Sequence, residues 1–124
     1  MRKETFLQTK TIEVPAGTAS TVIRSEVKLN SSYERCTGVA IYPIKQGGLD
    51  AFRVGLEDNG GALLQVTHQD ALTADKSLPF NDRFQEVDIP ANGHTVKINT
   101  QFDQQTTEKL VYDFVFRLTR TLKS

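Results

Sequence analysis

Cysteine and histidine are the residues of this chain most suited to catalysis or metal binding, and both are scarce. Cys36 is the single cysteine, and His68 and His94 are the two histidines among 124 residues. A nucleophilic thiol needs a base within hydrogen-bond reach, and a zinc site needs several close ligands. No metal-ligand spacing joins these three residues, and Cys36 precedes an apolar run at 38–42, where a small buried thiol is expected. We therefore expect no catalytic residue, no metal site and no cofactor.

Acidic residues offer two other kinds of chemistry. Asp70, Asp75 and Asp82 follow one another along a single irregular segment, and carboxylate oxygens are suitable calcium ligands. Their order does not match a calcium-binding loop, so calcium binding stays open only as an alternative to simple solvation. The acidic pair at 57–58 adjoins a turn signal, where charged side chains need no catalytic explanation.

Charge balance limits the partners of the protein. Fifteen basic residues match fifteen acidic ones, so no overall field attracts nucleic acid or an anionic membrane. Basic groups gather only near the two ends, at Arg2-Lys3 and at Arg117, Arg120 and Lys123. We expect these side chains to be solvated.

Length and hydropathy indicate one domain spanning 1–124, with 38% hydrophobic residues to build a core. The first residues lack the apolar stretch of a secretory signal, and no run is long enough to cross a membrane. We expect cytoplasmic synthesis, with incorporation into a larger assembly as a further step.

A repeated turn best reveals the architecture. The segments 12–17 and 87–93 both read apolar, acidic, apolar, Pro-Ala, and then Gly or Asn-Gly. Proline fixes φ at the start of a turn, and glycine accepts the positive φ that a turn requires. Each segment therefore predicts the end of one strand, a reversal and the start of another.

Alternation of apolar and polar residues then predicts eight strands. They cover 6–14, 21–29, 36–44, 52–57, 62–66, 84–89, 95–102 and 109–122. In the first, only the second half appears buried. In the third, both faces are apolar, and we expect pairing to stop by Tyr42 because Pro43 cannot donate to a ladder.

The last segment is ambiguous between helix and strand. Leu110, Phe114, Leu118 and Leu122 are spaced by four, as on one face of a helix. The same segment also alternates and is rich in valine, threonine and aromatic residues, which favours a strand.

Eight strands without a helix must bury their faces against one another, which predicts an all-β, eight-stranded antiparallel β-sandwich or a closed barrel. Eight strands with one long connection suit a jelly roll. An immunoglobulin-like sandwich is less suitable, because the chain has no tryptophan and only one cysteine.

The connection from His68 to Asp82 is the best candidate for a binding element. Long connections in compact domains are uncommon and often functional. This one carries three large apolar residues, Leu72, Leu78 and Phe80, which we predict to contact a protein partner. The alternative is that they fold back onto the sandwich.

On the repeated turns and the strand count, the chain resembles the short single jelly-roll proteins of virus particles, such as vertex, spike-base and head-decoration subunits of phages. That resemblance implies a non-enzymatic structural or assembly subunit that associates with itself or with a larger particle. The alternative is a carbohydrate- or ligand-binding β-sandwich module. Sugar platforms favour flat aromatic residues, and the absence of tryptophan weakens this alternative.

Overall fold

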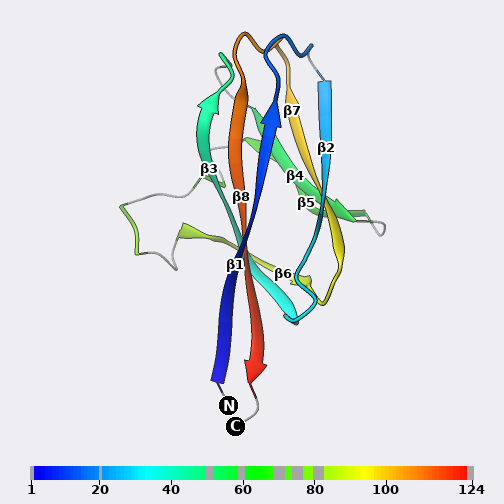
Figure 1. The fold of residues 1–124 in the computed structure, drawn as a ribbon, viewed down its shortest axis with the longest axis vertical. Coiled ribbons are helices and arrows are strands. Elements are labelled where there is room, and N and C mark those ends of the chain that lie inside the picture. The colour runs from blue at the N-terminus through cyan, green and yellow to red at the C-terminus, as the bar shows by residue number, and fades with distance from the viewer. Residues whose placement is uncertain are drawn as a thin grey trace.

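The described parts of the chain contain eight β-strands, joined by turns and loops, and no α-helix. The structure is a computed structural model, and it describes residues 2–19, 21–49, 52–58, 61–68, 72–73, 77–79 and 83–122. The strands are β1 (Arg2–Val14), β2 (Thr21–Lys28), β3 (Arg35–Gln46), β4 (Arg53–Asp58), β5 (Gly61–His68), β6 (Gln85–Pro90), β7 (Thr95–Phe102) and β8 (Leu110–Leu122) (Figure 1).

The strands form two four-stranded antiparallel sheets. Sheet A has the order β1-β8-β3-β6, and sheet B has the order β2-β7-β4-β5. Buried residues of both sheets belong to one hydrophobic core, so the sheets pack face to face. The predicted all-β sandwich is confirmed.

The order of pairing identifies a jelly roll. β4 pairs with β5, β3 with β6, β2 with β7 and β1 with β8, so each pair encloses the previous one. The chain is thus one long hairpin rolled up, in which additional β3–β8 and β4–β7 pairs complete the sheets. Only the β4–β5 connection stays within a sheet, and the other connections cross between sheets.

The ambiguous last segment is a strand, β8, and it lies between β1 and β3 in sheet A. Its even-numbered apolar residues from Leu110 to Leu118 are fully buried in the core. Spacing by two selects all five of these residues, whereas spacing by four selects only Leu110, Phe114 and Leu118. β-branched and aromatic side chains pack well on the pleated surface of a sheet, which explains why this segment forms a strand.

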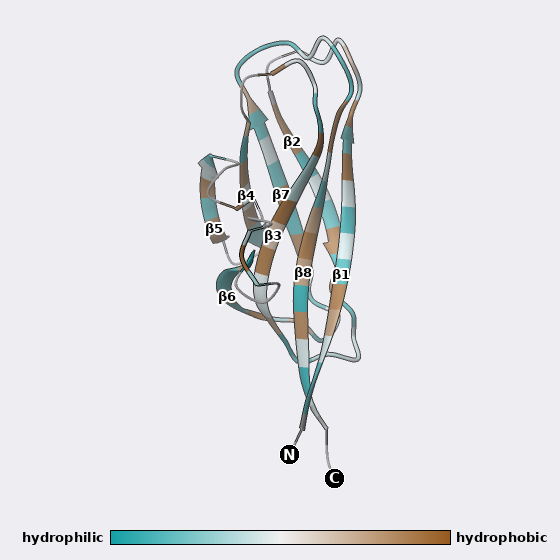
Figure 2. Ribbon diagram, turned by 90° about the vertical axis from the view of Figure 1, so that its left-hand side faces the viewer, coloured by the Kyte–Doolittle hydropathy of each residue, from teal (hydrophilic) through white to brown (hydrophobic). Residues whose placement is uncertain are grey.

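β1 is buried only in its second half, as predicted. Ile12 and Val14 lie in the core, whereas Phe6 is 39% exposed and stacks on Tyr33. The first residues of β1 pair with the last of β8 beyond the point where β3 joins the sheet, at the pair Arg35–Thr119. The two strands project there as a ribbon that carries both termini (Figures 1 and 2).

The predicted end of pairing at Tyr42 is wrong, because β3 continues to Gln46 and pairs with β8 throughout. Ile41 donates its N–H to the Leu72 carbonyl, away from β8. Pro43 has the same parity as Ile41, so its missing N–H lies on the side away from β8 and removes no bond to that strand. A register shift between Pro43 and Lys45 then restores the pairing.

Both Pro-Ala turns adopt the predicted backbone. Gly17 has φ +83° and Gly93 has φ +80°, a region that L side chains rarely occupy. Each turn carries the chain from sheet A to sheet B, between β1 and β2 and between β6 and β7. The prediction of a strand, a reversal and a new strand is confirmed.

Figure 2 shows hydrophobic residues along β3 and β8, and those from Val39 to Ile41 and from Leu110 to Leu118 are buried on both faces of sheet A. Val39 and Ile41 face the main core between the sheets. Ala40 faces outward and joins Phe84 and Val115 in a second, smaller apolar cluster. The segment that precedes β6 therefore covers part of the outer face of sheet A.

Candidate partner-binding site

The β5–β6 connection is attached to the sandwich at its first described residue pair. Leu72 is only 3% exposed and belongs to the main core. Its carbonyl accepts the N–H of Ile41 at 2.9 Å, and Thr73 forms a parallel bridge with Ile41. Leu72 therefore serves the fold of its own chain, in line with the alternative that apolar residues of this segment fold back.

The same connection is attached again at its far end. Phe84 is buried in the second apolar cluster on the outer face of sheet A. The guanidinium carbon of Arg117 lies 5.0 Å from the centre of the Phe84 ring, within the range of a cation–π contact. We call this pair the Phe84–Arg117 anchor.

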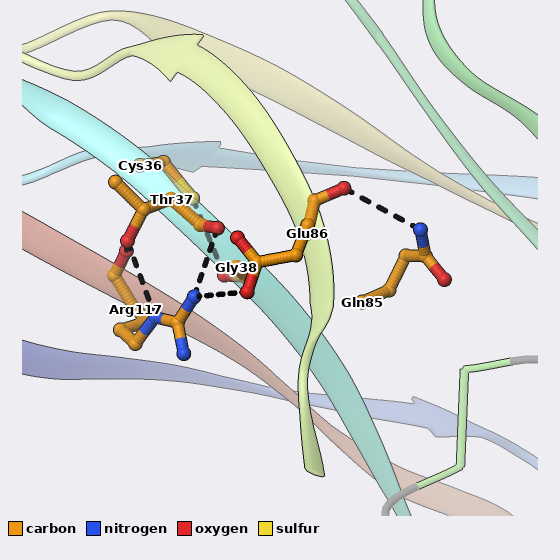
Figure 3. Close-up of polar contacts among 6 residues, drawn as sticks. All are labelled: Cys36, Thr37, Gly38, Gln85, Glu86 and Arg117. Carbon is orange, nitrogen blue, oxygen red and sulfur yellow. Dashed lines mark hydrogen bonds and ion pairs between the residues drawn. The ribbon is translucent and has the colours of Figure 1, made fainter. Parts of the chain in front are cut away.

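Arg117 also closes a bulge in β3 (Figure 3). Thr37 is an extra residue of β3 in its pairing with β8. Arg117 donates from Nε to Thr37 Oγ1 at 3.2 Å and from Nη2 to the Thr37 carbonyl at 3.1 Å. The arginine thus satisfies polar groups that an extra residue removes from the ladder.

An ion pair extends this arrangement to β6. Arg117 Nη2 lies 3.1 Å from Glu86 Oε1, as Figure 3 shows. The Arg117 side chain is 12% exposed, whereas that of Glu86 is 79% exposed. Sequence reasoning placed Arg117 in a solvated terminal patch. The structure places it in a nearly buried position, where its side chain crosses β3 and reaches β6.

Gly38 makes room for the anchor. A Cβ on this residue would lie 2.9 Å from Arg117 Nη2 and 2.9 Å from Phe84 Cβ, closer than real Cβ atoms approach. The apolar run of β3 therefore needs a glycine at this position. A glycine inside a predicted strand was the one sequence signal of this close approach.

Between its two attachments the connection presents an apolar tip. Ser77, Leu78 and Pro79 are exposed, and Leu78 is 41% exposed. Arg83 Nε donates to the Leu78 carbonyl at 3.0 Å, which ties the tip to the segment before β6. In Figure 1 residues 77–79 stand away from both sheets. Phe80, the third predicted contact residue, lies outside the described residues.

Cys36 and His94 make contacts that stabilise the fold. Burial is the main cause that raises the pKa of the Cys36 thiol to about 11, and its Sγ donates to the Gly38 carbonyl at 3.5 Å. His94 Nε2 lies 2.8 Å from Asp58 Oδ2, which joins the β6–β7 turn to the end of β4. His68 is the last residue of β5.

The residues that the structure describes contain no cluster of side chains suited to bind a metal ion. No group of three or more histidine, cysteine, aspartate or glutamate side chains is gathered there. The aspartates considered for calcium, Asp70, Asp75 and Asp82, lie outside those residues.

A pocket of about 220 Å³ lies at the end of sheet B where the pairing of β4 with β7 ends, at Arg53 and Gln101. It is lined by Leu49, Phe52, Arg53, His68, Gln101, Phe102, Asp103 and Gln104. Arg53 lies between His68 and Gln101 on the neighbouring strands. The three apolar residues are buried, and the polar side chains around them are more exposed.

No family model, curated protein or solved structure matches this chain. Across the described part of the chain, no helix is both long and apolar enough to cross a membrane.

Proposed function

We propose that this protein is a non-enzymatic assembly subunit whose β5–β6 connection contacts another copy of the chain. One observation carries the proposal: an exposed apolar tip at Leu78 and Pro79 is held between two buried attachments, Leu72 and the Phe84–Arg117 anchor. The bond from Arg83 Nε to the Leu78 carbonyl also restrains the backbone of the tip, and a restrained contact loses less conformational freedom on binding, which favours association.

The proposed setting is a virus particle, in which the protein is a vertex, spike-base or head-decoration subunit. Support comes from the jelly-roll pairing order and the small size of the chain, and it is an analogy of fold. The exposed tip supports the contact by itself, whether or not the protein belongs to such a particle.

Leu78→Asp tests the proposed contact, because a charge at an apolar contact opposes its burial. Sedimentation velocity over a range of concentrations should show larger oligomers for the unmodified chain than for the variant, with an unchanged melting temperature. Ile44→Asp is the matched control, since Ile44 is even more exposed but lies in the bulged part of β3. A Leu78→Asp variant that associates like the unmodified chain would contradict the proposal.

Binding of a small polar ligand is the second candidate function, and the pocket at the end of sheet B supports it. Buried aromatic rings with amide, guanidinium and carboxylate groups around them suit a sugar unit. Glucose and galactose, titrated while the side-chain amide signals of Gln101 and Gln104 are followed by nuclear magnetic resonance, test this function. Saturable shifts that Asp103→Ala abolishes would support it, and unmoved signals would reject it for these sugars.

A further inference from the structure

The sandwich has four edge strands, β1 and β6 in sheet A and β2 and β5 in sheet B. Each edge presents unpaired N–H and C=O groups that can pair with another chain. Natural proteins block such edges with charged residues, proline, short strands or cover.

β6 and β2 carry charged residues, and β6 also carries a proline. β6 is six residues long, contains Glu86 and Asp88, and ends at Pro90. β2 presents Arg24, Glu26 and Lys28 on the outer face of sheet B, at positions that alternate with its core residues.

The third edge, β1, is charged and partly tied down. It carries Lys3, Lys10 and Glu13 along its length. Gln8 donates from its amide to the Lys28 carbonyl at 2.8 Å and accepts the N–H of Asn30 at 2.9 Å, which fastens the middle of β1 to the end of β2.

The remaining edge, β5, has none of these side chains over most of its length. From Gly61 to Thr67 it contains no charged residue and no proline. Val66 is 42% exposed, and Leu63 and Leu64 are only partly buried against the core. Figure 2 shows β5 at the outer margin of the molecule, beyond β4. A neutral apolar strand at a free edge favours pairing with another strand.

We infer that the free edge of β5 pairs antiparallel with β5 of a second copy, about a two-fold axis. An overlap centred on Gln65 places Leu64 opposite Val66 and Ala62 opposite His68. No charged side chain then meets a like charge, so charge does not oppose self-pairing. Such an interface uses the same surface on both copies and closes at the dimer.

The expected dimer is weak. β5 has eight residues, and two register shifts between β4 and β5 increase its local twist. Both features limit the length of a regular joint and the area that it buries. Small interfaces of this kind belong to transient association, so dissociation at micromolar concentration is expected.

This inference adds a second surface to the assembly function proposed above, and the two surfaces can fail separately. Leu78→Asp removes the contact of the tip and should leave the β5 dimer intact. A charge on β5 should remove the dimer and leave any association through the tip.

Val66→Lys tests the β5 interface, and Gln65→Lys repeats the test at the exposed neighbouring position. Val22→Lys is the matched control, because Val22 is 38% exposed on the edge strand β2 of the same sheet. In sedimentation equilibrium on the Leu78→Asp background, each β5 change should raise the dimer dissociation constant by about tenfold or more. The control should leave it unchanged.

Backbone amide exchange gives a second readout that a loss of stability alone would not mimic. Amides of β5 should exchange more slowly as protein concentration rises, and amides of β2 should not. A Leu78→Asp protein that stays monomeric at every concentration would overturn the inference. So would equal weakening of the dimer by Val22→Lys and Val66→Lys.

Discussion

β5 and β6 are joined by one connection and lie at the free edges of different sheets, yet they differ in charge, in proline and in attachment. β6 carries two carboxylates and a proline, and the residue before it lies under Arg117. β5 is neutral from Gly61 to Thr67 and packs only partly against the core. The comparison suggests that one end of the connection fixes the fold and the other leaves a strand open to pairing.

Truncation of Phe84 should have the largest effect on this comparison. Phe84→Ala removes the buried ring beneath Arg117 and should lower the free energy of unfolding by about 3 kcal/mol. Val66→Ala, on the exposed side of β5, should cost less than about 1 kcal/mol. Urea unfolding of both variants measures the difference. Equal losses would show that the two ends are equally anchored.

Added methyl groups at two strand glycines should rank next. Gly38→Ala forces a Cβ against Arg117 and Phe84 in a strand that has neighbours on both sides, and should cost about 2–3 kcal/mol. Gly55→Ala meets Val66 on β5, which is an edge strand and can shift, so its cost should be about half as large. Thermal unfolding compares them, and a larger loss for Gly55→Ala would reverse the assignment of the rigid end.

Alkaline pH tests the region around the Phe84–Arg117 anchor through the thiol of Cys36 on β3. The pKa of Cys36 is raised from 9.0 to about 11, chiefly by burial, so the folded chain keeps a proton that the unfolded chain releases. Stability should therefore fall between pH 9 and pH 11, by about 2 kcal/mol. Cys36→Ala should reduce this fall when denaturant unfolding is measured across the range. The buried Tyr112, whose pKa burial also raises, would account for a fall that persists above pH 10.

Removal of the ion pair at β6 should have the smallest effect. Glu86 is mostly exposed, so Glu86→Gln should change stability by less than about 1 kcal/mol. Arg117→Gln should cost more, because it also removes the bonds to Thr37 and the contact with Phe84. Chemical denaturation at low and high salt separates these contributions. A comparable loss in both variants would mean that the ion pair dominates the anchor.

Strand positions could be predicted from the sequence because a period of two is local. The alternation in β2 and β7 and the glycines of the two Pro-Ala turns needed no knowledge of partners. The nested pairing depends on contacts between distant residues, such as Arg2 with Leu122, and no local pattern encodes them. Pro43 was misjudged for the same reason, since its tolerance depends on which side of β3 is unpaired.

The candidate site was predictable only as a segment. An irregular connection has no periodicity to separate inward from outward residues, so Leu72 and Leu78 looked equivalent although one is buried and the other exposed. Arg117 looked like a terminal surface charge because its role depends on a bulge in β3 and a glycine at 38. Whether Leu78 and Phe80 contact a partner stays a prediction.

The position of β8 in sheet A has a consequence for synthesis. β8 is the last strand in chain order, yet it is the partner of both β1 and β3. A ribosome makes the chain from its N-terminus. β3 can therefore pair with β6 early, but sheet A is completed only when β8 emerges. Sheet B draws on strands that are made earlier, and its β4–β5 hairpin closes the shortest loop. Until β8 is made, the edges of β1 and β3 that pair with it stay unpaired. A chaperone would protect the nascent chain most during this period.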